Sequence, residues 1–447
     1  MAPLNIAVVG SGISGLSAAW LLSKRHKVTL FEQDRRLGGH TNTTTVGTAE
    51  GTIPVDTGFI VYNELNYPNL TALFGHLGVR TEPTEMTFAV SANDGAFEYA
   101  GSGPGLFGQL SNVANPRQWR LVWDLFRFFR SARRALDNHP EGISLGDFLK
   151  AEGYSDPFIE DHILPMGAAI WSTPMVGMLE FPAATFINFY ANHGMLQAVG
   201  RPAWRTVTGG SKTYIDRLLE DGDIESAVDT PIRRIGRTPT CVHLEDAHGI
   251  VRMFDHVVIA THADQALELI AVPTPKEQAL LATFAYERNH AVLHRDKRFM
   301  PRRRRLWQSW NYIRRGQGLE CELCVSYWMN SLQNLPTKTD LFVTLNPPWD
   351  IHPKAIDLEV DYDHPVFDAE AIAAQRRLWS LQGKERTWFC GSYFGYGFHE
   401  DGLQSGLAVA EQLGGVSRPW SAPDESGRIH VTHDAGAAGA ASLVAAE

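Results

Sequence analysis

The sequence has few cysteines, no excess of basic residues and no unbroken apolar run long enough to span a membrane. Four cysteines among 447 residues, with no secretion signal, favour a reducing compartment and no disulfide framework. Residues 4–22 carry no charge, but glycines interrupt them and no basic residue precedes them, so we predict neither a signal peptide nor a membrane span. We therefore expect a cytoplasmic protein, with peripheral contact at the inner membrane as an alternative.

The charge balance excludes one class of partner. The formal net charge is −10, whereas a general nucleic-acid binder needs a dominant basic face. The length suits two closely connected domains, because one compact core rarely grows this large.

The first forty residues have the order strand, glycine turn, helix, strand and acid. Residues 6–9 predict a buried parallel strand, residues 13–23 a helix and residues 28–31 a second strand that ends on Glu32. In such a unit the first glycine makes the turn, the second lets a pyrophosphate approach, and the third lets the helix lie on the strand. These are Gly10, Gly12 and Gly15. The order predicts a dinucleotide site, with phosphate at the helix N-terminus and Glu32 on the adenosine ribose.

The next residues indicate which dinucleotide binds. Arg36-Leu37-Gly38-Gly39-His40 follows the acid and resembles the signature of flavin amine oxidases, phytoene-type desaturases and protoporphyrinogen oxidases. Three later stretches resemble the same superfamily in order: Asp56-Thr57-Gly58, residues 209–228, and residues 390–407. The resemblance implies FAD rather than NAD. It also implies cofactor contacts from Gly10, Gly12, Ile13, Ser14, Gly15, Glu32, Gln33, Arg36, Gly38, Gly39, His40, Thr57, Gly58, Val228, Ala260, Gly391, Ser392, Gly402 and Leu403.

The predicted fold class is α/β: a Rossmann-type FAD-binding domain with a parallel sheet, interleaved with a substrate domain of mixed sheet and helices. We expect residues 1–78, 205–272 and 385–417 in the FAD domain and residues 79–204 and 273–384 in the substrate domain. Residues 418–447 turn rich in alanine and glycine, and we expect disorder there. We also expect helices over 63–78, 118–136 and 214–219, and short strands between 226 and 261.

The stretch from Ile163 to Gly200 holds one acidic or basic residue, Glu180, among many aromatic and aliphatic ones. It predicts the wall of a pocket for a long apolar substrate, lined by Trp171, Phe186, Phe189 and Tyr190. Ordinary core packing explains the same pattern, and both interpretations stay open. The helix over 118–136 interleaves aromatic residues with arginines, which indicates either an interfacial helix or one packed on the domain with solvated arginines.

Two other patterns carry weaker signals. Residues 101–108 are rich in glycine, but they contain Pro104 and no β-branched strand precedes them. We therefore predict a loop rather than a second nucleotide site. Cys321 and Cys324 stand three apart in a predicted strand and therefore point to opposite faces. We predict no metal site.

The sequences of three segments resemble, within this superfamily, a bacterial branch whose genes often lie beside those of cyclopropane-fatty-acid synthases. These segments are His40-Thr41-Asn42-Thr43, Ala169-Ile170-Trp171-Ser172 and residues 396–402. Ser392 stands where many amine oxidases have an acid, which weakens the amine oxidase interpretation. The resemblance implies a desaturase of an unsaturated fatty acid or phospholipid, with His399 or Glu400 as catalytic residue and oxygen or another acceptor for the electrons. A double-bond isomerase, an amine oxidase and a non-catalytic flavin-bearing lipid carrier are the alternatives.

Overall fold

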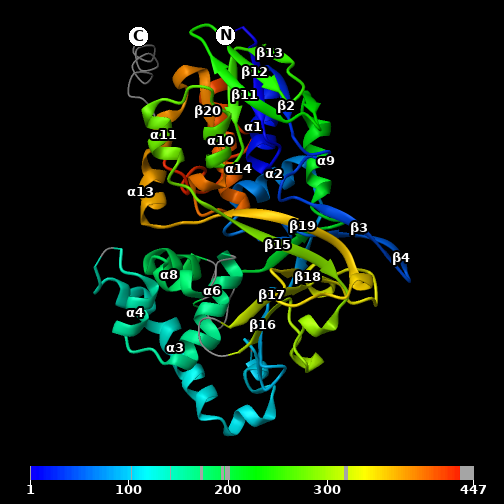
Figure 1. Cartoon of the computed structure of the whole chain (residues 1–447), viewed down its shortest axis with the longest axis vertical. Helices are drawn as coiled ribbons and strands as arrows, with labels where there is room; N and C mark the ends of the chain where they lie inside the picture. The colour runs from blue at the N-terminus through cyan, green and yellow to red at the C-terminus, as the bar shows by residue number, and fades with distance from the viewer. Residues whose placement is uncertain are drawn as a thin grey trace, which may run out of the picture. The chain divides into compact units, whose positions relative to one another are not determined.

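The computed structural model describes residues 2–101, 103–140, 142–171, 175–192, 196, 202–316 and 321–432. The chain divides into two compact units, each made of separate segments (Figure 1). Unit 1 comprises Met1–Gly39, Leu218–Phe284 and Glu370–Glu447, and unit 2 comprises His40–Arg217 and Ala285–Ala369. The chain thus alternates between the units, as expected for interleaved domains.

The boundaries of the units differ from those of the expected domains. Residues 40–78 and 205–217, expected with the FAD domain, pack within unit 2. The cause is local pairing, because residues 61–63 and 81–84 both pair with the strand at 204–207. Residues 273–284 and 370–384, expected in the substrate domain, pack within unit 1.

Unit 1 is built on a five-stranded parallel sheet in the order β10-β2-β1-β14-β20. The central strand β1 is buried over Ile6, Ala7, Val8 and Val9, which explains its continuous apolar sequence. The strands are β1 (Asn5–Val9), β2 (Lys27–Phe31), β10 (Ile224–Ala227), β14 (His256–Ile259) and β20 (Thr387–Phe389). A three-stranded antiparallel sheet adds β11 (Ile232–Arg237), β12 (Val242–Asp246) and β13 (Val251–Phe254).

The helices of unit 1 include one closely packed pair. They are α1 (Ile13–Ser23), α10 (Ala263–Leu269), α11 (Pro275–Leu281), α13 (Ala369–Leu378) and α14 (His399–Gly414), and α9 (Lys212–Asp221) ends in this unit. α14 lies directly on α1: a Cβ at Gly406 would stand 2.2 Å from the Ser14 carbonyl oxygen and 2.3 Å from Ser17 Oγ. Glycine is therefore needed at position 406 to let the two helix backbones meet.

Unit 2 contains a seven-stranded mixed sheet in the order β19-β15-β18-β17-β16-β7-β8. The long strands β15 and β19 run side by side (Figure 1). The sheet consists of β7 (Phe88–Ala92), β8 (Phe97–Ala100), β15 (Tyr286–His294), β16 (Trp310–Arg315), β17 (Glu322–Trp328), β18 (Phe342–Leu345) and β19 (Ile356–Pro365). Two small sheets hold β3 (Thr43–Thr48) with β4 (Gly51–Asp56), and β5 (Val61–Asn63) and β6 (Thr81–Thr84) with β9 (Trp204–Val207).

A group of helices completes unit 2, and α3, α4, α6 and α8 gather together in it (Figure 1). The helices are α2 (Pro68–Leu77), α3 (Pro116–Leu136), α4 (Leu145–Ala151), α5 (Asp156–Phe158), α6 (Leu164–Trp171), α7 (Met175–Glu180), α8 (Ala183–Asn192) and α12 (Met329–Leu332), with a π-helix over Ile159–Ile163. Among the described residues, no helix combines the length and apolar character that a membrane crossing requires.

Three local expectations differ from the structure. The helix expected over 63–78 begins at Pro68, because proline suits the first helical turn and residue 63 ends β5, with a turn over residues 64–66. Residues Gly103–Phe107, predicted as part of a loop, form a short 3₁₀ helix. Residues 418–432, expected to be disordered, are held to unit 1 by ion pairs of Arg418 with Glu411 and of Arg428 with Asp401. Residues 433–447 lie outside the described residues.

The contact between α1 and α14 gives a matched pair of substitutions. Gly406→Ala should lower the free energy of unfolding by about 1–3 kcal/mol, because the new methyl group overlaps α1. Gly75→Ala in α2, where a Cβ would meet no atom within 4 Å, should raise it by about 0.5–1 kcal/mol. Thermal melting of both variants beside the parent chain tests this, and equal shifts of one sign would contradict the packing described.

Candidate flavin site

The predicted cofactor residues of unit 1 meet at one edge of the parallel sheet. Ala227, Phe31, Val9 and Ile259 are in register on neighbouring strands, so the residues that follow them share the carboxyl edge. These residues are Val228, Glu32, Gly10 and Ala260. The ladder continues one step further, since the N–H groups of Glu32, Gly10 and Ala260 donate to Ala227, Phe31 and Val9. Ligands of open α/β sheets bind at this edge.

Glu32 is held in place by the glycine turn. Its side chain is 9% exposed, and it accepts hydrogen bonds from the Ser11 N–H at 2.9 Å and from the Ser11 hydroxyl. The Asp34 N–H donates to its other oxygen at 2.9 Å. The carboxylate is therefore oriented before any ligand binds, which suits a group that accepts hydrogen bonds from a ribose.

The start of α1 fits a diphosphate. Gly12 is the N-cap residue, no side chain caps the helix, and its first turn has no acidic residue. The first N–H groups and the positive end of the helix dipole are thus not neutralised by an acidic group of that turn. A Cβ at Gly12 would meet no atom within 4 Å, so open space lies where a diphosphate would approach Gly12, Ile13 and Ser14.

The Gly38-Gly39 loop lies against the same turn. The Gly38 N–H donates to the carbonyl oxygen of Ser11 at 3.1 Å and to its hydroxyl oxygen at 3.0 Å. A Cβ at Gly39 would lie 3.2 Å from the α carbon of Gly12, and both loop glycines have positive φ. The loop therefore needs glycine. Gln33 and Arg36 lie on the segment that connects Glu32 to this loop.

The closing motif brings α14 to the same helix α1. A Cβ at Gly402 would lie 2.9 Å from the Ile13 side chain, and Leu403 is fully buried. The packing explains the glycine, and the predicted cofactor contacts of Gly402 and Leu403 remain predictions. Gly391 and Ser392 follow β20, where the Gly391 N–H donates to Ser405 Oγ at 3.0 Å.

The two predicted catalytic residues open α14 and differ in environment. Glu400 is fully buried and accepts a hydrogen bond from Gln404 Nε2 at 3.0 Å. His399 retains some solvent exposure, yet the protein atoms packed around it lower its pKa to about 3. The imidazole is therefore neutral across the physiological pH range, and it is a weak base for proton abstraction.

In unit 2 the predicted residues Thr57 and Gly58 lie beside His40. A Cβ at Gly58 would stand 2.1 Å from the His40 carbonyl oxygen, so only glycine lets the two segments meet. Tyr362 Oη lies 2.8 Å from Thr57 Oγ1 and accepts from Asn42 Nδ2 at 3.0 Å. Tyr362 belongs to β19, more than 300 residues from this turn, and sequence reasoning missed it.

A buried carboxylate of the Asp56-Thr57-Gly58 stretch, to which the sequence assigned no role, supports the same turn. Asp56 is fully buried and accepts hydrogen bonds from the N–H and hydroxyl of Ser211, from the hydroxyl of Thr43 and from Gln333 Nε2. Burial raises its pKa to about 6, although these donors favour the ionised form. The network joins the end of β4 to the Gly209-Gly210 turn before α9, so it positions Thr57 and Gly58.

The predicted substrate residues form one aromatic cluster. The Trp171 ring lies 4.8 Å from that of Phe189 and 5.6 Å from that of Phe186, and Phe186 stacks on Tyr190 at 4.4 Å. Phe186 and Tyr190 are buried, whereas Trp171 and Phe189 are partly exposed. Residues 172–174, 193–195 and 197–200 belong to the same predicted wall and lie outside the described residues.

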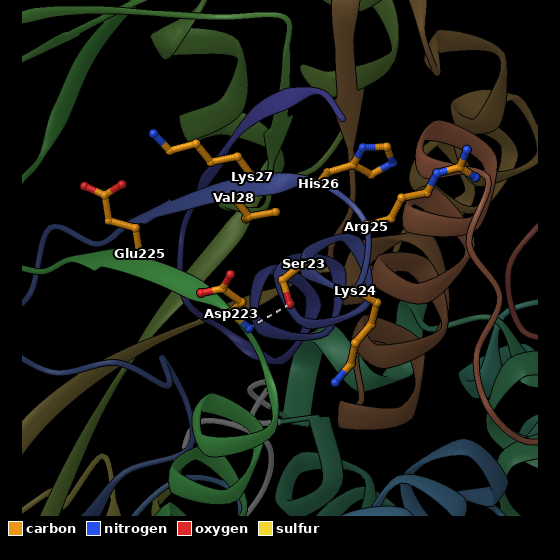
Figure 2. A pocket seen from close by; sticks show the side chains of 8 residues that line it. All are labelled: Ser23, Lys24, Arg25, His26, Lys27, Val28, Asp223 and Glu225. Atoms are coloured by element: carbon orange, nitrogen blue, oxygen red, sulfur yellow. Dashed lines mark hydrogen bonds between the residues drawn. The ribbon is translucent and has the colours of Figure 1, made fainter. Parts of the chain in front are cut away.

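A separate surface hollow of about 550 Å³ lies at the other edge of the sheet of unit 1 (Figure 2). Its lining consists of residues 23–28, where α1 ends and β2 begins, and of Asp223 and Glu225 around the start of β10. Its charged side chains point in different directions (Figure 2), so they do not converge on one ligand. In the described part of the chain, no group of three or more histidine, cysteine, aspartate or glutamate residues is placed to hold a metal ion.

The family model for flavin containing amine oxidoreductases matches residues 13–331. The chain belongs to that family. It is therefore a FAD-dependent oxidoreductase, and the carboxyl edge of unit 1 supplies residues that fit FAD.

Solved structures share the fold over most of their length. A putrescine oxidase with bound putrescine is 14% identical, covers 92% of this chain and 99% of its own, and has a TM-score of 0.63. A CLA-producing fatty acid isomerase from P. acnes is 14% identical, with 92% and 98% covered and a TM-score of 0.62. A cyclohexylamine oxidase from Brevibacterium oxydans is 16% identical, with 92% and 99% covered and a TM-score of 0.61.

Gly12 allows cofactor binding to be separated from folding. Its φ of −61° and ψ of 174° are open to valine, and the site has room for a side chain. Gly12→Val should therefore fold and melt like flavin-free parent protein but purify colourless, because the side chain fills the space of the diphosphate. Gly47→Val, at another open glycine in β3, should stay yellow. Normal flavin absorbance in the Gly12 variant would contradict the assigned site.

Proposed function

We propose that this oxidoreductase desaturates an unsaturated fatty acyl chain, presented as a free fatty acid or a phospholipid. The observation that carries the proposal is the aromatic cluster of Trp171, Phe186, Phe189 and Tyr190 in unit 2. Between Ile163 and Gly200 the sequence holds a single acidic or basic residue. Such surroundings suit a substrate that binds through apolar contacts rather than through ion pairs.

Burial of an acyl chain can contribute enough binding free energy that few polar contacts are needed. Burying one CH₂ group contributes roughly 0.8 kcal/mol, so an acyl chain of about sixteen carbons gains on the order of 10 kcal/mol before the costs of association. The fatty acid isomerase from P. acnes, which shares the fold, supports an acyl substrate as a chemical class for this architecture. The putrescine oxidase and the cyclohexylamine oxidase share the same fold, so an amine substrate remains an alternative.

Bound FAD would supply a hydride acceptor. In the proposal the chain's own residues do the rest: the N-terminus of α1 and Glu32 bind and orient the cofactor, and the aromatic cluster of unit 2 holds the acyl chain and keeps water out. His399 and Glu400 are the proposed proton acceptors, with His399 acting as a neutral imidazole whose lowered pKa makes it a weak base. His399→Ala with unchanged turnover would remove His399 from that role. Oxygen or a separate acceptor would take the electrons.

Turnover of defined lipids tests the proposal. We expect the yellow enzyme, mixed anaerobically with an unsaturated fatty acid or its phospholipid, to lose flavin absorbance and to give a product two hydrogen atoms lighter. An isomer of unchanged mass would establish the redox-neutral double-bond isomerase instead. Peroxide and aldehyde from amines would establish an amine oxidase. Stoichiometric lipid binding without bleaching would indicate a flavin-bearing carrier.

The aromatic cluster can be tested with one substitution. If Phe189 lines the channel for the acyl chain, Phe189→Trp should shorten the preferred chain while flavin content stays normal, because the larger ring blocks the channel end. If the residue belongs only to the core, the same change should lower the melting temperature and leave chain-length preference alone. A series of acyl lengths and a melting curve on this variant decide between the two.

A further inference from the structure

The surface of unit 2 has an exposed aromatic face that packing does not explain. On α3, Trp119 is 52% exposed, Trp123 73% and Phe126 51%. Leu110 and Val113, in the 3₁₀ turn before the helix, are 75% and 53% exposed. A single exposed apolar residue is ordinary on a protein surface, but five on adjoining elements form a patch of the kind that marks an interaction site.

The patch is continuous and held rigid. Trp119 Nε1 donates to the Val113 carbonyl oxygen at 2.9 Å, and its ring lies 4.7 Å from that of Phe107. The opposite face of α3 is anchored in the unit, since Leu121, Leu125 and Phe128 are buried. The helix is therefore already packed on one side, and the exposed stripe is additional to what folding needs.

Arginines continue the same stripe toward the C-terminal end of α3. Trp119, Trp123, Phe126, Arg130 and Arg133 follow one another at spacings of four, three, four and three, which places them on one helix face. Arg120, Arg130, Arg133 and Arg134 are all exposed.

The other charged residues on and near α3 do not cancel the positive charge of these exposed arginines. The single acidic residue of α3, Asp124, is buried and is bonded to Arg127 and to the Ser155 N–H. Asp137, just beyond the helix end, is the nearest exposed acidic residue along the chain. Arg117 and Arg127 are engaged with Glu160, Asp161 and Asp124. The exposed face thus combines an apolar half with a net positive half, although the whole chain has a net charge of −10.

We propose that this face of α3 docks on an anionic lipid surface, with Trp123 and Phe126 entering the headgroup boundary and the arginines contacting lipid phosphates. Aromatic residues concentrate at that boundary, and helices that lie in it carry basic residues on their polar side. An anionic membrane complements this face in charge. A two-fold contact with the same face of a second copy would bring arginines against arginines, and an uncharged apolar partner would leave the arginines without a counter-charge. The proposal goes beyond the proposed reaction, and its test does not depend on turnover.

Flotation of the full-length, FAD-loaded protein with lipid vesicles tests the surface. The parent chain should float with vesicles of two parts phosphatidylcholine to one part phosphatidylglycerol, and at least tenfold less with phosphatidylcholine alone. High salt should weaken the binding, because exposed charges are screened. Trp123→Ser with Phe126→Ser should reduce binding at least tenfold, and Arg130→Gln with Arg133→Gln and Arg134→Gln should abolish the preference for the anionic lipid.

A matched control uses two exposed apolar residues elsewhere. Leu65 and Val272 are 69% and 77% exposed, and the Leu65→Ser/Val272→Ser variant should bind vesicles like the parent chain. All variants should keep parental flavin content and melting temperature, since every changed side chain is exposed. Absent vesicle binding, or equal loss in the control, would overturn the proposal. A dimer that dissociates on the Trp123/Phe126 change, without vesicle binding, would instead make the face a contact between copies.

Discussion

The structure of unit 1 depends on how closely α1 approaches the end of β1. A Cβ at Gly15 would stand 1.9 Å from the Gly10 carbonyl oxygen, so no other residue permits the helix to leave the strand at this angle. This contact aims the N-terminus of α1 at the carboxyl edge of the sheet. A second close contact, at Gly406, then seats α14 on α1. Two glycine contacts thus determine where the elements of the cofactor site lie.

Unit 2 is organised around a polar rather than an apolar constraint. The Asp56 carboxylate is buried and bonds to Thr43 of the paired strand β3 and to two segments that are distant in the chain, through Ser211 and Gln333. A buried carboxylate is costly unless it is fully hydrogen-bonded, and here its donors come from the segments that surround the predicted Thr57-Gly58 turn. The same logic applies to Tyr362, whose hydroxyl bonds to Thr57 and Asn42.

The local structure of the first unit could be predicted from the sequence because its signals are short-range. The helix over 13–23 was predicted with its observed bounds, and the strands β1 and β2 each begin one residue earlier than expected. Glu32 could be placed at the site because it directly follows the second predicted strand of the glycine-turn unit, whereas Val228 was assigned only from the family resemblance. Gln333 and Tyr362 could not be found in this way, since each meets its partner across more than 270 residues and no spacing rule links them. The start of α2 was predicted wrongly because the apolar spacing of residues 70–77 indicates a helix but does not show where that helix begins.

The central claim is that FAD binds along the carboxyl edge of the parallel sheet of unit 1, on the N-terminus of α1. A crystal structure of the yellow protein tests it most directly. The account predicts the diphosphate within hydrogen-bonding distance of the first N–H groups of α1, with the adenosine ribose on the carboxylate of Glu32. Flavin density away from the Gly10–Gly15 turn, or a ribose with no contact to Glu32, would contradict it.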